Sequence, residues 1–233
     1  MTADGGSMPG RLLHLPYGDA ALHWLLGALG LLIFVSEPLR ELGLFPAWLQ
    51  AVCLAAIVLA GLLGLKAPTR LAWPLTLLVA IVLVAQTLNA AGALREWAAG
   101  SGLLTAACLA LLAMALVKQV FAAGRVTTAR IEGAVALYLI VALAFAILYG
   151  VVASMLSGAF NLGPDDGLVE ILDRRFLYFS LITQTSTGYG DVTPVHGVAR
   201  SLATLQAVGG QIFTAVLLAR LVSLEIMDRR AGD

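Results

Sequence analysis

The sequence predicts an all-α membrane protein with six transmembrane helices and a short re-entrant helix between the last two. Three observations predict this fold class. Of the 233 residues, 60% are apolar and 12% are charged, which differs from the composition of a soluble domain. Six apolar runs are each close in length to the ~20 residues that a helix needs to cross a bilayer. The charged residues lie mostly between these runs.

The helices are expected where the chain is apolar, and their ends where prolines and charges occur. Pro46 and Pro74 lie near the starts of two runs, where proline costs no helical hydrogen bond. Pro38 lies just past the first run, so we expect the first helix to end before it. The six expected transmembrane helices cover residues 20–36, 46–65, 71–90, 102–121, 130–155 and 197–224.

These helices are expected to form two membrane domains between two short ends. Residues 1–19 contain Gly, Pro and polar side chains and are predicted to be an N-terminal arm. The first four helices form a domain at 20–125, the last two a pore domain at 126–225, and residues 226–233 a tail. With the N-terminus inside, nine of the 14 basic residues lie on the cytoplasmic side, as the positive-inside rule favours. We therefore expect a multi-pass protein of the cell (inner) membrane with both termini in the cytoplasm.

A segment too short to cross the bilayer lies between the fifth and sixth helices. Residues 156–172 contain Gly, Asn and Asp and are interpreted as a solvated loop on the outer side. Asp173 is a suitable N-cap for a helix over 174–185, which would reach only mid-membrane. The C-terminal end of such a helix carries partial negative charge and favours a nearby cation.

The residues that end this segment read Thr-Gln-Thr-Ser-Thr-Gly-Tyr-Gly-Asp, from Thr183 to Asp191. Backbone outside a helix is tolerated in a membrane only where it is buried in protein or lines a watery path. Gly188 and Gly190 can adopt positive φ, so that successive carbonyls turn to one side of an extended strand. Rings of such carbonyls can replace the hydration shell of a monovalent cation.

This stretch resembles the selectivity filter of potassium channels, whose pattern is Thr-x-x-Thr-x-Gly-Tyr-Gly-Asp. With six helices and one pore segment, the chain resembles a prokaryotic potassium channel of the voltage-gated-like superfamily. The resemblance implies a homotetramer in the bilayer, since each chain supplies one strand, with potassium as the permeant ion and no cofactor. Potassium is expected at Ser186, Thr187, Gly188 and Tyr189, and Gly190 completes the filter.

The resemblance also implies support for the filter from the residues around it. Tyr178 and Phe179 match an aromatic pair that braces the filter in this family. The remaining supporting residues are expected to be Thr183, Thr185 and Asp191.

The sixth helix is expected to line a cavity and a gate below the filter. Gly210 comes twenty residues after Gly190, where relatives have a hinge glycine, and close helix packing at Gly209 and Gly210 is the alternative. The expected cavity and gate residues are Gly209, Gly210, Gln211, Thr214, Leu218 and Val222.

The fourth expected helix lacks the series of basic residues that a voltage sensor needs. A voltage sensor needs several Arg or Lys residues at every third position of one membrane helix. Residues 102–121 contain a single basic residue, Lys118, at the inner end. We therefore expect a channel without voltage-sensor gating, whose stimulus the sequence does not identify.

Two departures from the family pattern leave alternatives open. Ser186 replaces the usual threonine, and Thr187 replaces the usual Val or Ile. A weakly selective monovalent cation channel and a non-conducting membrane subunit with the pore fold are therefore alternatives. No Gly-x-Ser-x-Gly motif or paired His lies at membrane depth, so an enzyme is not expected. Zero net charge implies no nucleic-acid partner, and Cys53 and Cys108 are expected to be buried without a role as ligands.

Overall fold

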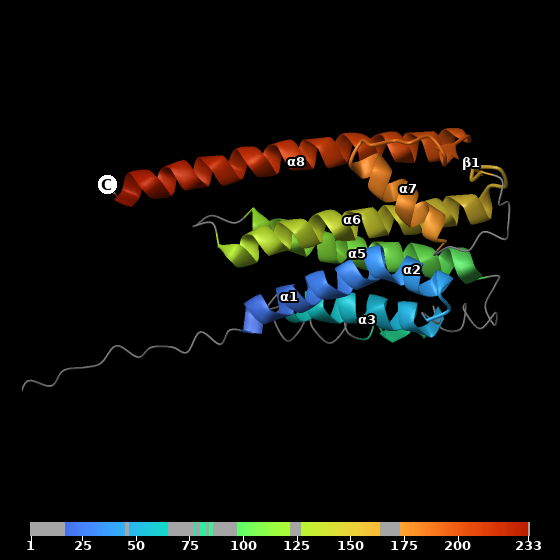
Figure 1. Ribbon diagram of the computed structural model, residues 1–233, viewed down its shortest axis with the longest axis horizontal. Helices are drawn as coiled ribbons and strands as arrows, with labels where there is room; N and C mark the ends of the chain where they lie inside the picture. Colours follow the sequence, from blue (N-terminus) through green and yellow to red (C-terminus); the bar gives the residue numbers. More distant parts are fainter. Residues whose placement is uncertain are drawn as a thin grey trace, which may run out of the picture.

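Long apolar helices, with one short pair of strands, make up nearly all of the chain that the computed structural model describes. Figure 1 shows the helices side by side along one axis, with α8 along one side of the bundle and α1 and α3 along the other. The expected arm and the third expected helix lie outside the described residues for most of their length. The described residues are 17–44, 47–64, 77, 80–82, 84–85, 97–121, 127–163 and 173–232.

The first expected helix is longer and less regular than the sequence predicts. α1 covers Tyr17–Gly30, a π-helical segment covers Leu31–Val35, and α2 covers Ser36–Glu41. Pro38 therefore lies inside α2, and the expectation that it follows the end of the helix is wrong. Proline is tolerated there because it occupies the first turn of α2, directly after the π-helical segment, where it has no regular i−4 hydrogen bond to lose.

Three of the other helices begin and end near the expected residues. α3 covers Ala47–Gly64, α5 covers Ala98–Val120 and α6 covers Thr128–Met155. Thr127 caps α6, since its hydroxyl accepts a hydrogen bond from the Arg130 amide at 3.3 Å. Among the described residues, three helices are long and apolar enough to cross a membrane, namely Ala98–Lys118, Arg130–Met155 and Gly197–Arg220.

An apolar core joins α1, α3, α5 and α6. On α1, Leu22, Leu25 and Leu29 recur at helical spacing and are buried. Inside a bilayer this packing stabilises the bundle through van der Waals contacts rather than through the removal of apolar surface from water. Cys53 and Cys108 are buried, as expected, and neither forms a disulfide with the other. The fully buried residues that α3, α5 and α6 contribute to the core include Ile57, Leu109, Leu137, Ile140 and Ile147.

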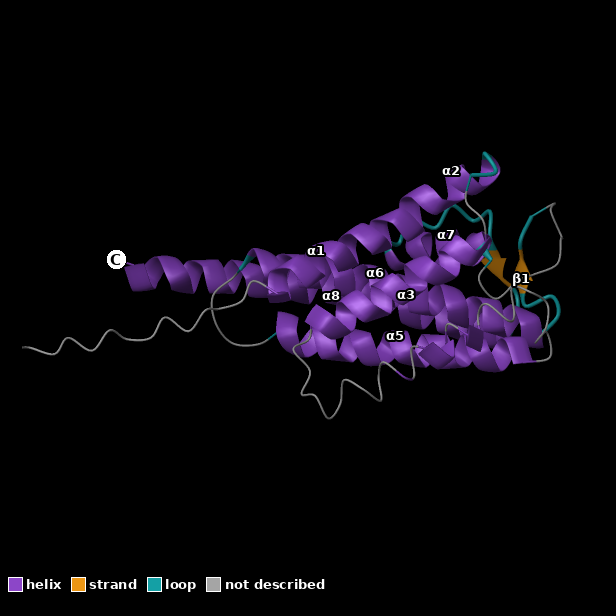
Figure 2. Ribbon diagram, turned by 90° about the horizontal axis from the view of Figure 1, so that it is seen from below, coloured by secondary structure: helices purple, strands orange, loops and turns teal. Residues whose placement is uncertain are grey.

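The segment before α7 contains a strand that the sequence analysis did not predict. β1, Phe160–Asn161, pairs in antiparallel fashion with β2, Thr193–Pro194, at one end of the bundle (Figure 2). Phe160 is buried and packs edge-on against the ring of Tyr149, with 5.6 Å between centroids. The interpretation of residues 156–172 as a solvated loop is therefore wrong for Ala159 and Phe160, which are buried.

The last two helices flank the segment that resembles a filter. α7, Arg174–Gln184, slants between α6 and α8 (Figure 1). α8, Gly197–Gly232, is continuous through the two central glycines and extends from the expected end at residue 224 to Gly232. The predicted tail at 226–233 is therefore helical as far as Gly232. Only 11% of the apolar part of α8 is buried, against 61% for α6, so α8 leaves most of its apolar surface uncovered in a single chain.

Candidate functional site

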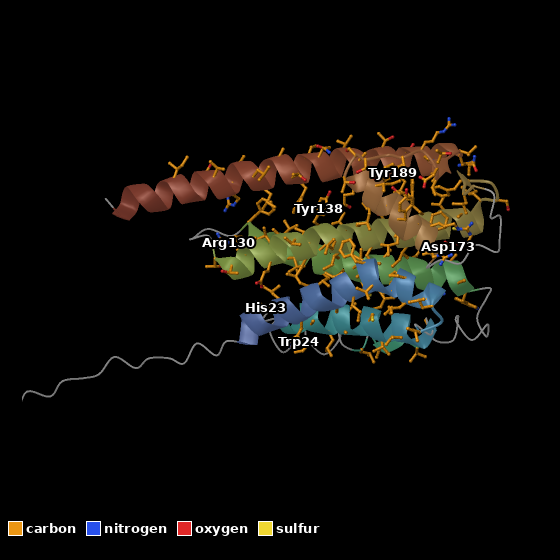
Figure 3. The ribbon with its side chains drawn as sticks, viewed as in Figure 1. His23, Trp24, Arg130, Tyr138, Asp173 and Tyr189 are labelled. Carbon is orange, nitrogen blue, oxygen red and sulfur yellow. The ribbon has the colours of Figure 1, made fainter. Side chains whose placement is uncertain are left out.

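α7 begins at a capped N-terminus and ends next to the non-helical residues 186–190, which form an extended segment that is called the strand and is distinct from β1 and β2. The Asp173 carboxylate accepts a hydrogen bond from the Arg175 amide at 2.9 Å and pairs with its guanidinium at 2.7 Å. The N-cap predicted at Asp173 is therefore confirmed. Figure 3 shows Asp173 near one end of α6 and Tyr189 beside α8. The partial negative charge at the C-terminus of α7 lies next to residues 185–191.

The strand after α7 alternates between backbone conformations of opposite hand. φ is +56° at Ser186, +52° at Gly188 and +82° at Gly190, whereas φ is not positive at Thr187 or Tyr189. Among the described residues, Ser186 is the one non-glycine residue with positive φ. Left-handed backbone costs a residue with a Cβ roughly 1–2 kcal/mol, which the surrounding contacts must offset. Alternation of this kind turns successive carbonyls toward one side of the strand.

Backbone hydrogen bonds attach the beginning of the strand to the last turns of α7. The donors are the backbone amides of four consecutive residues, 185–188. The side chains of 185–191 are all exposed in a single chain. The amide donors and carbonyl acceptors are Thr185 to Leu181 at 3.0 Å, Ser186 to Thr183 at 3.0 Å, and Thr187 and Gly188 to Ile182 at 2.8 and 3.3 Å. The strand is thus held through its amides, and its carbonyl oxygens remain available as ligands.

Two threonine hydroxyls support the beginning of the strand. The Thr185 hydroxyl lies 2.8 Å from the carbonyl oxygen of Leu181 and 2.8 Å from the Thr187 hydroxyl. Thr187 therefore has a hydroxyl partner. Thr183, also expected to support the filter, contributes its carbonyl oxygen to the Ser186 amide.

The two expected bracing aromatic residues make different contacts. The rings of Tyr178 and Tyr189 are stacked, with 6.5 Å between centroids and 3° between planes. A hydrogen bond with the Asp191 carboxylate raises the pKa of Tyr178 to about 12, so this hydroxyl is protonated at neutral pH. Phe179 instead packs on Tyr149 of α6, with 4.9 Å between centroids. Tyr178 thus contacts the strand, and Phe179 anchors α7.

Two adjacent residues of α8 approach the end of α7 and the strand that follows it. A Cβ at Gly210 would collide with the carbonyl oxygen of Gln184 and lie 2.9 Å from its Cγ, whereas a Cβ at Gly209 would meet nothing within 4 Å. Gly210 therefore permits close contact between α8 and the end of α7. The side-chain amide of Gln211 donates a hydrogen bond from its Nε2 to the Ser186 Oγ at 2.9 Å.

The remaining expected cavity residues lie further along α8. The Thr214 hydroxyl donates to the Gly210 carbonyl at 3.0 Å, within its own helix. Leu218 and Val222 are exposed. The structure therefore brings Gln211 to the strand, and it leaves Leu218 and Val222 on an open surface of the single chain.

Sequence reasoning missed a buried polar network behind the strand. Ser180, Gln184 and Gln206 are only 0%, 1% and 2% exposed. Tyr138 and Tyr149 of α6 form hydrogen bonds with the two glutamines. The signal in the sequence is Gln206 itself, a polar residue in the middle of an apolar run, where a side-chain amide needs partners.

The strand is the part of the described chain that is suited to hold an ion. Within the described residues, no group of three or more His, Cys, Asp and Glu side chains could hold a metal ion. Backbone carbonyl and hydroxyl oxygens are the ligands with which channels replace the water around a monovalent cation. One chain provides such oxygens from one side only.

Comparison with known proteins indicates an ion channel. Residues 134–225, which include most of α6, all of α7 and most of α8, match a protein family described as ion channel. The chain is 37% identical to Protein LctB of Bacillus caldotenax over 87 residues, which are 36% of this chain and 64% of that protein. It is also 37% identical to Protein LctB of Geobacillus stearothermophilus over 82 residues, which are 34% and 60% of the two chains. The chain thus spans less than two thirds of the length of these relatives. No solved structure matches the chain.

Proposed function

We propose that four copies of this chain form a potassium-selective channel through which ions move passively. The observation that carries the proposal is the strand 186–190, which alternates in backbone hand and is exposed in a single chain. Non-helical backbone at membrane depth is tolerated where it lines an ionic path. Four copies around one axis would surround a dehydrated ion with oxygens from all sides, at Ser186, Thr187, Gly188 and Tyr189.

The uncovered surface of α8 supports assembly around an axis on the strand side of the chain. Its apolar part is far less buried than that of α6, and its exposed residues include Leu205, Val208, Ile212 and Val216. Apolar residues at this spacing form a stripe along a helix. In the proposed tetramer, part of this stripe packs against neighbouring copies and part lines the pore.

The proposal extends to the arrangement of the whole chain in the membrane. The chain is proposed to cross the inner membrane six times, with both termini in the cytoplasm. This topology places Asp191 on the outer side. α5 carries Lys118 near its C-terminal end and no ladder of basic residues, so the channel is proposed to open without a voltage sensor.

Flux from liposomes tests this function. Purified protein is reconstituted in liposomes, its assembly state is measured by native mass spectrometry, and potassium and sodium efflux are compared. We expect a tetramer that releases potassium at least ~10-fold faster than sodium, which corresponds to about 1.4 kcal/mol of preference. A tetramer that releases neither ion, at any pH or membrane tension applied, would favour a non-conducting subunit and overturn the proposal.

A weakly selective cation channel is the second candidate, because one contact favours it. Ser186, the expected innermost ligand, already accepts a hydrogen bond from Gln211, which occupies one of the two lone pairs of its hydroxyl. Reversal potentials measured in mixed potassium and sodium distinguish the two candidates. A weakly selective channel would show nearly equal permeabilities, and Ser186→Thr would then increase the preference for potassium.

A further inference from the structure

Gln206 is the centre of a polar network that is closed to solvent in a single chain. Its Oε1 accepts a hydrogen bond from the Tyr149 hydroxyl at 2.6 Å. Its Nε2 lies 2.7 Å from the Ser180 hydroxyl oxygen, 3.2 Å from the Ser180 carbonyl oxygen and 3.0 Å from Oε1 of Gln184. One side chain of α8 thus binds to α6 and to two successive turns of α7.

The same residues of α7 are attached to α6 by a second set of hydrogen bonds. The Ser180 hydroxyl donates to the Ala142 carbonyl at 2.6 Å, and Nε2 of Gln184 donates to the Tyr138 carbonyl at 2.7 Å. The Tyr138 hydroxyl donates to the Gln184 carbonyl at 3.2 Å. Figure 3 shows Tyr138 between α6 and α8. These donor and acceptor assignments are mutually consistent, because each hydroxyl donates once and each amide nitrogen meets only acceptors.

The anchored turns of α7 are the turns that hold the strand. Gln206 fixes α7 at Ser180 and Gln184, and the carbonyls between these two residues accept the amides of residues 185–188. A shift of this part of α7 would therefore move the beginning of the strand. Gly210, one turn after Gln206, lets α8 approach the Gln184 backbone closely enough for these contacts.

We infer that Gln206 is a positioning residue that sets the geometry of the ion-binding strand through Ser180 and Gln184. The inference rests on the proposed function for its effect on selectivity, whereas its effect on the order of the strand can be measured without conduction. Removing the amide leaves several buried polar groups without their partner, at a depth where water does not replace it. The last turns of α7 would then lose their fixed position, and residues 185–188 would follow.

The test compares the unmodified chain with three single variants and with the double variant Gln206→Leu/Tyr149→Phe. Gln206→Leu removes the centre of the network, and Tyr149→Phe removes one hydrogen bond while keeping the ring. Thr204→Val is the matched control, because the Thr204 hydroxyl lies on the same helix, is exposed, and donates a hydrogen bond to the Arg200 carbonyl of its own helix, at 2.9 Å. Hydrogen exchange of the amides of 185–188 is compared with that of α5, and potassium and sodium efflux are measured on the same samples.

We expect Gln206→Leu to speed amide exchange at 185–188 roughly tenfold, and to lower the ratio of potassium to sodium efflux by a similar factor. Tyr149→Phe should cause changes of about threefold, and adding it to Gln206→Leu should cause little more, because both act on one network. Exchange in α5 and all properties of Thr204→Val should match wild type.

Each result decides for or against the inference. Wild-type exchange and selectivity in both Gln206→Leu and Tyr149→Phe would overturn it. If Gln206→Leu does not assemble, Tyr149→Phe decides alone, and wild-type behaviour in that variant assigns the network to folding only. If wild-type protein passes no potassium, the proposed function fails, and the exchange data still decide whether Gln206 orders the strand.

Discussion

The two halves of this bundle are held together in different ways. From α1 to α5, buried contacts are almost wholly apolar, and the buried polar residue that the described part contains, Thr105, bonds to the Ser101 carbonyl of its own helix. Around α7 the buried residues instead include Ser180, Gln184 and Gln206, which bond between helices. α6 belongs to both halves, with leucines facing the first and tyrosines facing the second.

The apolar half supports the bundle, whereas the half around α7 holds the proposed ion-binding strand. Apolar helices in a bilayer can slide or repack at modest cost, because their contacts have little directional preference. Hydrogen bonds fix both distance and orientation, so a polar network specifies one arrangement more strictly. The half that must hold a strand with positive φ at Ser186, Gly188 and Gly190 is the half that has such a network. The two halves should therefore respond differently to substitution.

The largest effect is expected in the strand itself. Gly188→Ala and Gly190→Ala each place a Cβ on backbone with φ of +52° and +82°, which alanine adopts only with strain. The strand would move away from this conformation, and its carbonyls would no longer face one side. We expect potassium efflux from liposomes to fall to background in both variants.

Gly158 provides a matched control for backbone strain outside the strand. Its φ is +72°, and a Cβ there would meet nothing within 4 Å. Gly158→Ala should lower thermal stability by about 1 kcal/mol, by the cost of left-handed backbone, and keep wild-type efflux. Wild-type efflux in both Gly188→Ala and Gly190→Ala would contradict the proposal that the strand conducts the ion, whatever the result for Gly158→Ala.

The second largest effect is expected where α8 meets α7. A Cβ at Gly210 collides with the Gln184 carbonyl oxygen, whereas one at the adjacent Gly209 meets nothing. Gly210→Ala should destabilise the protein by about 1–3 kcal/mol, as overpacking does. Gly209→Ala should be neutral or stabilising by up to about 1 kcal/mol, because alanine favours a helix. Thermal unfolding of both variants in detergent measures the difference, and equal midpoints would show that close packing at Gly210 is unimportant.

A smaller effect is expected at Tyr178, the α7 residue whose ring stacks on Tyr189 of the strand. Tyr178→Phe removes the hydroxyl bonded to Asp191 and keeps the ring stacked on Tyr189. Because this hydroxyl is solvent-accessible and supports the strand through one interaction, the ratio of potassium to sodium efflux should fall by no more than roughly a few-fold. Tyr178→Leu, which also removes the ring, should lower it further. If the two variants have equal ratios, the hydroxyl and not the stacking supports the strand.

The sequence predicted the local geometry of α7 and of the segment that follows it, because its local signals are strong. Asp173 caps α7 as expected, and the chain leaves the helix after Gln184, one residue before the predicted end. Positive φ at Gly188 and Gly190 follows from the freedom of glycine to adopt it. Positive φ at Ser186 was not expected, since it depends on contacts with α7 and on the hydrogen bond from Gln211.

The sequence could not predict features that depend on contacts distant in the chain. The partners of Gln206 lie 22 to 57 residues away, and no local pattern brings Tyr149, Ser180 and Gln184 together. The pairing of Phe160–Asn161 with Thr193–Pro194 is likewise a long-range contact between two-residue strands. Pro38 was misplaced because a local rule for helix ends does not include a π-helical segment before it.

The smallest effect is expected at the C-terminal end of α5, in the half held by apolar packing. Lys118 is exposed in the last turn of this helix, where it interacts favourably with the partial negative charge of the helix end. Lys118→Gln should lower stability by about 0.3–1 kcal/mol and leave the dependence of current on voltage unchanged. A single charge at the end of a helix moves through little of the membrane field, so planar-bilayer currents should show less than about one gating charge per chain before and after the substitution. A steep voltage dependence that Lys118→Gln reduces would mean that the apolar half acts as a sensor, and the division between support and function would fail there.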